Sequence, residues 1–133
     1  MDNLFDTGDF IKISGNTPSL KNSKTFTTLK NGRTVLLPSK TVSNYYKNNE
    51  YQYQINKAKF LKMIKDKPLP LKVGFYFVRD SKRKFDYINA AQVVQDLMVK
   101  HGWIEDDNCD FIIPVFDGYE VDKDDPCVKI TIK

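Results

Sequence analysis

The amino-acid sequence predicts an α+β fold: a single domain with a mixed, mainly antiparallel sheet and two principal helices. Runs that alternate between polar and apolar residues, or that are rich in β-branched and aromatic residues, are separated by turn residues and predict strands. Two longer segments carry apolar residues at helical spacing instead. The chain has 133 residues, the length of one domain, so residues 1–133 are assigned to one unit.

The predicted strands occupy residues 8–14, 25–30, 34–37, 71–79, 111–116 and 128–132. Asn31-Gly32 favours a tight turn, so the second and third strands are expected to form a hairpin. Residues 71–79 are rich in β-formers on both faces, which predicts a central strand. Pro114 favours a sheet edge or a bulge, because proline cannot donate a ladder hydrogen bond. The acidic run 117–126 is expected to be a solvated loop inside a final hairpin.

The first long helix is expected to follow Pro38, with Ser39 or Thr41 as its N-cap, and to end at Pro68 and Pro70. Several of its aromatic residues lie near lysines: Tyr45, Tyr51 and Tyr53. One interpretation is a surface that stacks on nucleic-acid bases. The interpretation that we favour places most of these rings at the rim of the core, with their hydroxyls in water.

The second helix is predicted from Asp86 to Lys100. Its apolar stripe consists of Ala90, Val93, Leu97 and Met98. Asp86 stands at the N-cap position, where a carboxylate lies at the positive end of the helix dipole. Gly102 stands where the helix would stop, and Trp103 is expected to pack in the core.

Charged residues bracket this second helix. Lys82-Arg83-Lys84 precede it, and Asp106-Asp107 follow it. The helix would be about 22 Å long at ~1.5 Å per residue, so the chain must fold back if the two later acids are to meet Asp86. Carboxylate oxygens would then converge beside a basic loop, which is the chemistry of a metal-dependent phosphodiesterase. Asp96 lies about 15 Å along the helix axis from Asp86 and is expected to be structural.

Charge divides the chain into two unequal halves. Residues 1–84 hold 17 Lys and Arg against 6 Asp and Glu, a balance of +11, whereas residues 85–133 hold 4 against 11, a balance of −7. A basic front half with an acidic back half suits a polyanion-binding surface beside a metal-binding pocket. A lysine-rich solvated surface is the alternative interpretation of the charge alone.

The sequence also bears on compartment. No apolar run approaches the ~18 residues of a membrane span, and the first residues lack the basic start and apolar core of a signal peptide. Cys109 and Cys127 flank the predicted final hairpin and are expected to be reduced thiols. We therefore expect a cytoplasmic protein that does not associate with membranes.

The segment from Lys82 to Asp107 resembles the RusA family of Holliday junction resolvases. The family pattern is a basic run, Asp-x-Asp-Asn at a helix start, a Lys three residues after the Asn, and Gly-x-x-x-Asp-Asp after the helix. The positions that match are Lys82, Arg83, Lys84, Asp86, Asn89, Gly102, Asp106 and Asp107. Thr17-Pro18-Ser19 and Asn22 also resemble the family's Pro-Ser-x-Asn segment, and the order of strands and helices is similar over nearly the whole chain.

The resemblance implies a homodimer that binds branched DNA, grips four-way junctions and nicks two strands symmetrically in DNA recombination and repair. It implies Mg²⁺ as the cofactor, for which Mn²⁺ can substitute, with Asp86, Asp106 and Asp107 as metal ligands. Asp86, Asn89 and Asp107 are the implied catalytic residues. The implied DNA contacts, which hold the backbone without reading bases, are Lys82, Arg83, Lys84 and Gln92.

Two positions depart from the family pattern: Ile88 stands in place of the second acid and Gln92 in place of the Lys. At a helix start the side chains of Ile88 and Asp86 can still face one pocket. We favour a working nuclease in which Glu105 or Asp106 supplies the missing carboxylate. The alternatives are a non-catalytic protein that binds branched DNA, and a phage-type protein whose dimer surface binds a protein partner.

Overall fold

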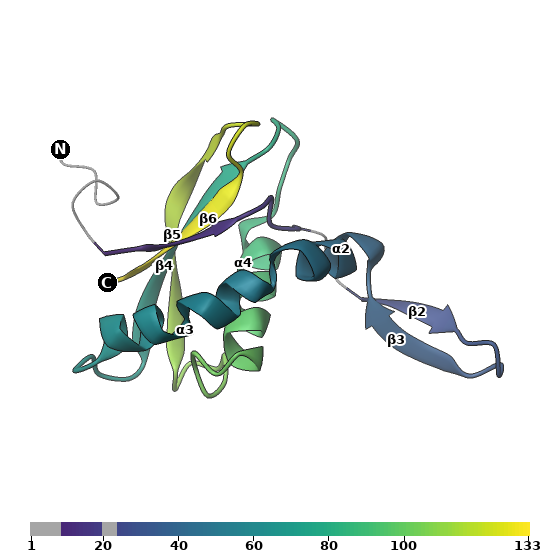
Figure 1. The fold of residues 1–133 in the computed structure, drawn as a ribbon, viewed down its shortest axis with the longest axis horizontal. Helices are drawn as coiled ribbons and strands as arrows, with labels where there is room; N and C mark the ends of the chain where they lie inside the picture. Colours follow the sequence, from purple (N-terminus) through teal and green to yellow (C-terminus); the bar gives the residue numbers. More distant parts are fainter. Residues whose placement is uncertain (1–8, 20–23) are drawn as a thin grey trace.

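The computed structural model describes residues 9–19 and 24–133, and in them the chain forms six strands and three helices (Figure 1). The strands are β1 (Ile11–Ser14), β2 (Lys24–Thr28), β3 (Thr34–Pro38), β4 (Leu71–Arg79), β5 (Ile112–Val121) and β6 (Cys127–Ile132). The helices are α2 (Lys40–Asn49), α3 (Tyr51–Ile64) and α4 (Tyr87–Lys100). The α+β class predicted from the sequence is confirmed.

Four of the described strands form one mixed sheet in the order β1-β6-β4-β5. The β1–β6 and β6–β4 pairs are antiparallel, and the β4–β5 pair is parallel. The predicted central position of residues 71–79 is therefore confirmed. The predicted final hairpin is wrong, because β4 lies between β5 and β6 and the two last strands never pair with each other. The helix α4 is the crossover that a parallel β4–β5 pair requires.

Strand β5 is longer than the sequence predicts. It pairs only with β4 in the described chain, so Pro114 lies on an edge strand as expected. The strand runs through Asp117 and Gly118 to Val121, and residues 117–121 are not the loop that was predicted. The register shifts between Phe75 and Tyr76 of β4, which makes Asp117 an extra residue in a β-bulge. Gly118 takes the positive φ of 117° at this irregularity.

The predicted hairpin is confirmed as β2 and β3, which pair antiparallel from Thr25–Leu37 to Thr28–Thr34. The turn is closed by the backbone bond from Leu29 N–H to the carbonyl of Arg33. Gly32 has a φ of +83°, a conformation that glycine adopts without strain. In the part of the chain that the structure describes, these two strands pair only with each other, and they project from the body as an arm (Figure 1).

The middle helix begins as predicted, with the Ser39 hydroxyl accepting a hydrogen bond from the backbone N–H of Val42 at 3.3 Å. It is divided at Glu50 into α2 and α3, which the sequence did not predict. Glu50 keeps helical backbone angles, but its carbonyl accepts from Tyr53 N–H, a bond three residues apart instead of four. The Glu50 carboxylate accepts hydrogen bonds from Lys100 and His101 at the end of α4, which tie the junction of α2 and α3 to α4.

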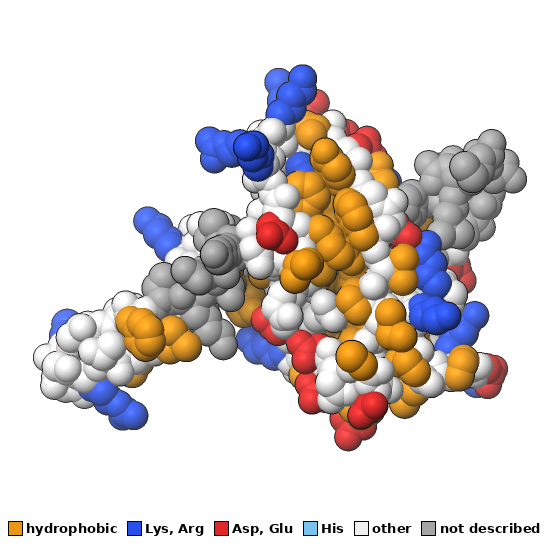
Figure 2. Space-filling model, turned by 180° about the vertical axis from the view of Figure 1, so that it is seen from behind, with side chains coloured by type: hydrophobic (Ala, Val, Ile, Leu, Met, Phe, Trp, Pro, Cys, Tyr) orange, Lys and Arg blue, Asp and Glu red, His pale blue; other side chains and the backbone are white. Residues whose placement is uncertain are grey.

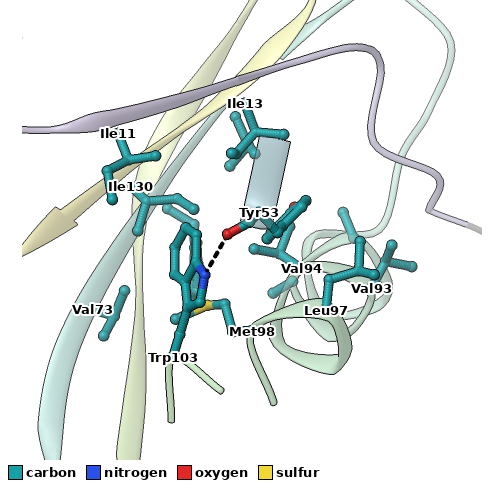
Figure 3. Packing of buried hydrophobic residues seen from close by; sticks show 14 of the residues in the cluster. Ile11, Ile13, Tyr53, Val73, Val93, Val94, Leu97, Met98, Trp103 and Ile130 are labelled. Atoms are coloured by element: carbon teal, nitrogen blue, oxygen red, sulfur yellow. Dashed lines mark hydrogen bonds between the residues drawn. The ribbon is translucent and has the colours of Figure 1, made fainter. Parts of the chain in front are cut away.

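One hydrophobic core fills the space between the sheet and the helices (Figure 3). The inward strand residues are fully buried: Ile11, Ile13, Val73, Phe75, Phe77, Val128 and Ile130. Trp103, as predicted, packs here, and its indole N–H donates to the carbonyl of Tyr53 at 2.7 Å. The expectation that most of the helix tyrosines hold their hydroxyls in water is wrong for Tyr45 and Tyr53. Both rings are buried, and their hydroxyls lie 3.3 Å apart.

Cys109 is exposed, Cys127 is buried, and both are free thiols as expected. Across residues 9–19 and 24–133, none of the helices has the length and apolar character needed to span a bilayer.

Candidate functional site

The start of α4 is fixed by Asp86, whose extended backbone leaves it just outside the helix. Its Oδ1 accepts hydrogen bonds from the backbone N–H groups of Ile88 at 2.9 Å and Asn89 at 3.4 Å. These bonds satisfy two of the donors that a helix N-terminus leaves unpaired. Within the described residues the second oxygen, Oδ2, has no hydrogen-bond partner. The N-cap that the sequence predicts is confirmed, and half of its carboxylate remains available to a ligand.

The segment after β1 packs beside the start of α4. Arg79, at the end of β4, is buried and donates from its guanidinium to the carbonyl of Thr17. The side-chain amide of Asn89 donates to the carbonyl of Ser19 at 3.4 Å. The Thr17-Pro18-Ser19 segment therefore lies against the helix start that carries Asp86. Asn22, the other residue of that motif, lies outside the described residues.

The chain folds back after α4, as a shared site requires. Gly102 ends the helix with a φ of +74°, and buried Trp103 anchors the return. Asp107 then reaches the side of α4, where its Oδ2 accepts a hydrogen bond from Nε2 of Gln92 at 2.9 Å. Gln92 lies six residues after Asp86, about 9 Å further along the helix axis. The two ends of the predicted motif thus meet the same helix, one turn and a half apart.

Asp106 makes different hydrogen bonds from its neighbour Asp107. Its Oδ1 accepts from the backbone N–H of Asp107 at 2.8 Å, and its Oδ2 accepts from the amide of Asn108 at 3.1 Å. Both oxygens therefore stabilise the local turn. Asp106 and Glu105 are exposed, and of these acids only Asp107 makes a hydrogen bond to α4 within the described chain.

Sequence reasoning missed the connection of Asp96 to this group. Nε2 of Gln92 donates to Oδ1 of Asp96 at 2.7 Å as well as to Asp107, so one amide nitrogen joins two carboxylates. Asp86, Asn89, Gln92 and Asp96 are spaced three, three and four residues apart, which places them along one side of α4. This spacing could have indicated from the sequence that Asp96 lies on the same side of the helix as Gln92. The distance from Asp86 excludes Asp96 from the start of the helix, but it does not exclude Asp96 from the surroundings of Asp107.

A cleft of about 660 Å³ opens beside the helix start and is lined by Ser19, Lys84, Phe85, Asp86, Ile88 and Asn89. Ile88 therefore faces the same cleft as Asp86, as expected from the irregular backbone of a helix start. Its side chain is 73% exposed. An exposed isoleucine contributes an apolar wall here and no ligand oxygen.

A second cleft of about 540 Å³ shares Lys84 and Phe85 with the first. Its wall combines cationic and aromatic side chains: Arg79, Lys82, Arg83, Lys84, Phe85, Tyr87, Phe116 and Tyr119. The Arg79 guanidinium lies 4.6 Å from the centre of the Phe85 ring. Burial, with a smaller contribution from Asp117, raises the pKa of Tyr87 to about 12, so this hydroxyl stays neutral. Figure 2 shows a band of apolar side chains on this side of the molecule, with basic side chains at its upper end and acidic ones beside its lower end.

The described residues contain no group of three or more His, Cys, Asp or Glu side chains that could hold a metal ion. A closed site of the structural-zinc kind is therefore not formed by them. Mg²⁺ needs less from a protein, because it binds through one or two carboxylates and keeps several waters. Asp86 and Asp107 each have one carboxylate oxygen without a hydrogen-bond partner in the described chain, so each could offer Mg²⁺ an oxygen, but Asp107 contacts the helix at Gln92 and not at Asp86.

Comparison with known proteins adds no family to this description. Neither a scan against protein-family models nor a search of curated proteins finds a match to the chain.

Proposed function

We propose that this protein is a metal-dependent, structure-selective endodeoxyribonuclease of the RusA kind, which nicks Holliday junctions or other branched DNA in recombination and repair. The observation that carries the proposal is the return of Asp107 to α4, where Gln92 holds it on the helix that Asp86 caps. The basic loop Lys82-Arg83-Lys84 lies next to Asp86 and lines the neighbouring cleft. Carboxylates that can hold a metal ion beside basic side chains suit metal-dependent hydrolysis of a phosphodiester.

Each residue has a separate task in this proposal. Asp86 and Asp107 would hold Mg²⁺ or Mn²⁺, which when bound polarises the scissile phosphate and lowers the pKa of the attacking water. Gln92 orients the Asp107 carboxylate, and its donors are occupied by Asp96 and Asp107, so it serves the acids and not the DNA in this arrangement. Asn89 holds the loop at Ser19 against the helix start. Lys82, Arg83 and Lys84 would hold the DNA backbone by charge.

Nicking of a labelled four-way junction tests the proposal. We expect the unaltered protein to nick junction DNA, but not linear duplex, with Mg²⁺ or Mn²⁺, and we expect Asp86→Asn and Asp107→Asn each to abolish nicking. Asp110→Asn is the matched control, because Asp110 is an exposed acid in the same turn and its substitution removes the same charge. Equal nicking by Asp107→Asn and the unaltered protein would remove this site from the reaction.

The second candidate is a protein that binds branched DNA without cutting it. The exposed Ile88 favours this candidate, because it occupies the cleft position where the family carries an acid. The double variant Ile88→Asp with Gln92→Lys separates the two. A working nuclease nicks without these changes. A protein that nicks only as the double variant is a junction binder without the ligands that catalysis needs.

Two equivalent nicks on a two-fold symmetric junction call for a closed homodimer. Strand β5 is an edge strand that exposes Phe116, Tyr119 and Val121, a surface that suits contact with a second copy. Light scattering should give the dimer mass, and a monomer that binds a junction one to one would contradict this part of the proposal.

A dimer that binds neither junction nor duplex would favour the third candidate, a protein whose dimer surface binds another protein. We assign the activity to the cytoplasm.

A further inference from the structure

The β2–β3 arm carries an apolar surface that the rest of the described chain does not cover. Phe26 is 78% exposed and Leu36, directly opposite it in the register, is 52% exposed. Leu37, on the opposite face of the ribbon, and Leu29, just after β2, are exposed as well. An isolated two-stranded hairpin is only marginally stable in water, and a cluster of exposed large apolar residues marks a binding surface. The described residues of the chain therefore leave these side chains open to a partner.

The charge of the arm identifies the kind of partner. From Lys24 to Pro38 the sequence holds three Lys and Arg and no Asp or Glu. Lys30 and Arg33 flank the turn of the arm, and both are exposed. Figure 2 shows a patch of apolar side chains on the part of the arm nearest the body and basic side chains toward its far end. A surface that is basic without a single acid is complementary to a polyanion.

The shape and the position of the arm suit duplex DNA. A two-stranded β-ribbon fits a DNA groove. Five residues per strand span about 17 Å, or roughly half a turn of B-form DNA. The arm begins five residues after Ser19, whose carbonyl binds Asn89 at the start of α4. DNA that reaches the candidate site would thus pass close to the root of the arm.

We propose that the β2–β3 arm is a second DNA-binding element, which lies along a duplex arm of branched DNA away from the site of cleavage. Lys30 and Arg33 contact phosphates. Phe26 and Leu36 make apolar contacts with base edges in the groove, such as the methyl groups of thymine. This inference rests on the proposed function, because it gives the same protein an additional contact with the same DNA.

The test is binding without cleavage: fluorescence anisotropy of a labelled four-way junction in EDTA, over a range of salt concentrations. Lys30→Ala with Arg33→Ala should lower the slope of log K against log salt by about 0.9 for each phosphate that the variant no longer neutralises. Phe26→Ser with Leu36→Ser should weaken binding about tenfold and leave the slope unchanged, since apolar contacts release no counterions. Lys62→Ala with Lys65→Ala is the matched control; these exposed lysines lie at the end of α3 that is far from the arm, and the slope should not change (Figure 1).

Each outcome has a distinct meaning. If the unaltered protein binds the junction and both arm variants bind it with unchanged affinity and slope, the arm is not a DNA element, while the proposed nuclease stands. If Phe26→Ser with Leu36→Ser halves the mass of the DNA-free protein in light scattering, the arm packs on a second copy instead and the inference is overturned. If the unaltered protein does not bind junction DNA at all, the proposed function fails together with the arm.

Discussion

Nε2 of Gln92 and Oδ2 of Asp107 lie 2.9 Å apart, although 15 residues separate them in the sequence. This single bond shows that the polypeptide turns back along α4, and it fixes the orientation of the Asp107 carboxylate. Because the same nitrogen also donates to Asp96, the amide holds two carboxylates on one side of the helix. Gln92 is therefore a positioning residue in the proposed nuclease, and the first prediction concerns it.

We expect Gln92→Ala to reduce junction nicking by about 10–100-fold, the usual cost of removing a group that orients a metal ligand. Gln92→Lys should retain most of the activity, because the ammonium can still donate to Asp107. Single-turnover nicking at several Mn²⁺ concentrations measures the effect, which should appear as a weaker apparent metal affinity. Gln54→Ala, an exposed glutamine on α3, is the control. Wild-type metal affinity in Gln92→Ala would show that Asp107 needs no such support.

Asp86 combines a structural and a proposed catalytic task, and two substitutions can separate them. Asparagine keeps the acceptor that receives the Ile88 and Asn89 N–H groups, so Asp86→Asn should unfold at nearly the same urea concentration as the unaltered protein. Asp86→Ala removes the cap and should cost about 1 kcal/mol of unfolding free energy. Both substitutions should abolish nicking. Nicking by the well-folded Asp86→Asn would mean that the carboxylate is only a helix cap.

The sequence predicted the parts of the fold that follow from local pattern. Strand β4, the cap at Asp86 and the stop at Gly102 all depend on residues close together in the chain. The extension of β5 was missed because Asp117 and Gly118 disfavour strands by propensity. In the fold, a bulge accommodates them, and the Asp117 carboxylate binds Lys133 at 2.7 Å and Thr131 at 3.2 Å on β6 and after it. Contacts between residues this far apart in the sequence cannot be predicted from a local pattern.

The same limit applies to the candidate site. Helix length required the chain to fold back only if Asp106 and Asp107 are to meet Asp86, and in the structure Asp107 does return to α4, at Gln92. The irregular backbone of a helix start allowed Ile88 and Asp86 to face one cleft, and they do. The sequence pattern did not show which of Asp106 and Asp107 would reach α4, because the two acids are adjacent. In the structure both oxygens of Asp106 accept hydrogen bonds within the local turn. The break at Glu50 carries no Gly or Pro to mark it. Its partners, Lys100 and His101, come from another helix.

Trp103 and Tyr53 supply a test of the core. Trp103→Phe fills much of the same space but removes the indole N–H that donates to the Tyr53 carbonyl at 2.7 Å. That carbonyl lies inside α3 and keeps its helical hydrogen bond, so we expect the loss of one net hydrogen bond, about 1 kcal/mol, in urea denaturation followed by circular dichroism. Tyr51→Phe, a change at a ring that is 58% exposed, should alter stability by less than about 0.5 kcal/mol. A Trp103→Phe variant as stable as this control would show that the hydrogen bond makes no net contribution to the free energy of unfolding.

Glu50 predicts how stability depends on pH. Burial opposes ionisation of this carboxyl, but the hydrogen bonds from Lys100 and His101 outweigh it and lower the Glu50 pKa below its ordinary value. A carboxyl with a lowered folded-state pKa stabilises the fold above its unfolded pKa of about 4.3, and that stability is lost as pH falls through the folded-state pKa. Glu50→Gln should therefore be less stable than the unaltered protein at pH 7, by about 1 kcal/mol for a partly exposed ion pair.

This difference in stability between the two proteins should shrink below pH ~4, where the Glu50 carboxyl of the unaltered protein becomes protonated and, like glutamine, carries no charge. Urea midpoints of both proteins across this range measure it, and Asp66→Asn, an exposed acid beyond the end of α3, is the control. A stability difference that stays constant down to pH ~3 would mean that Glu50 acts through packing and not through its charge.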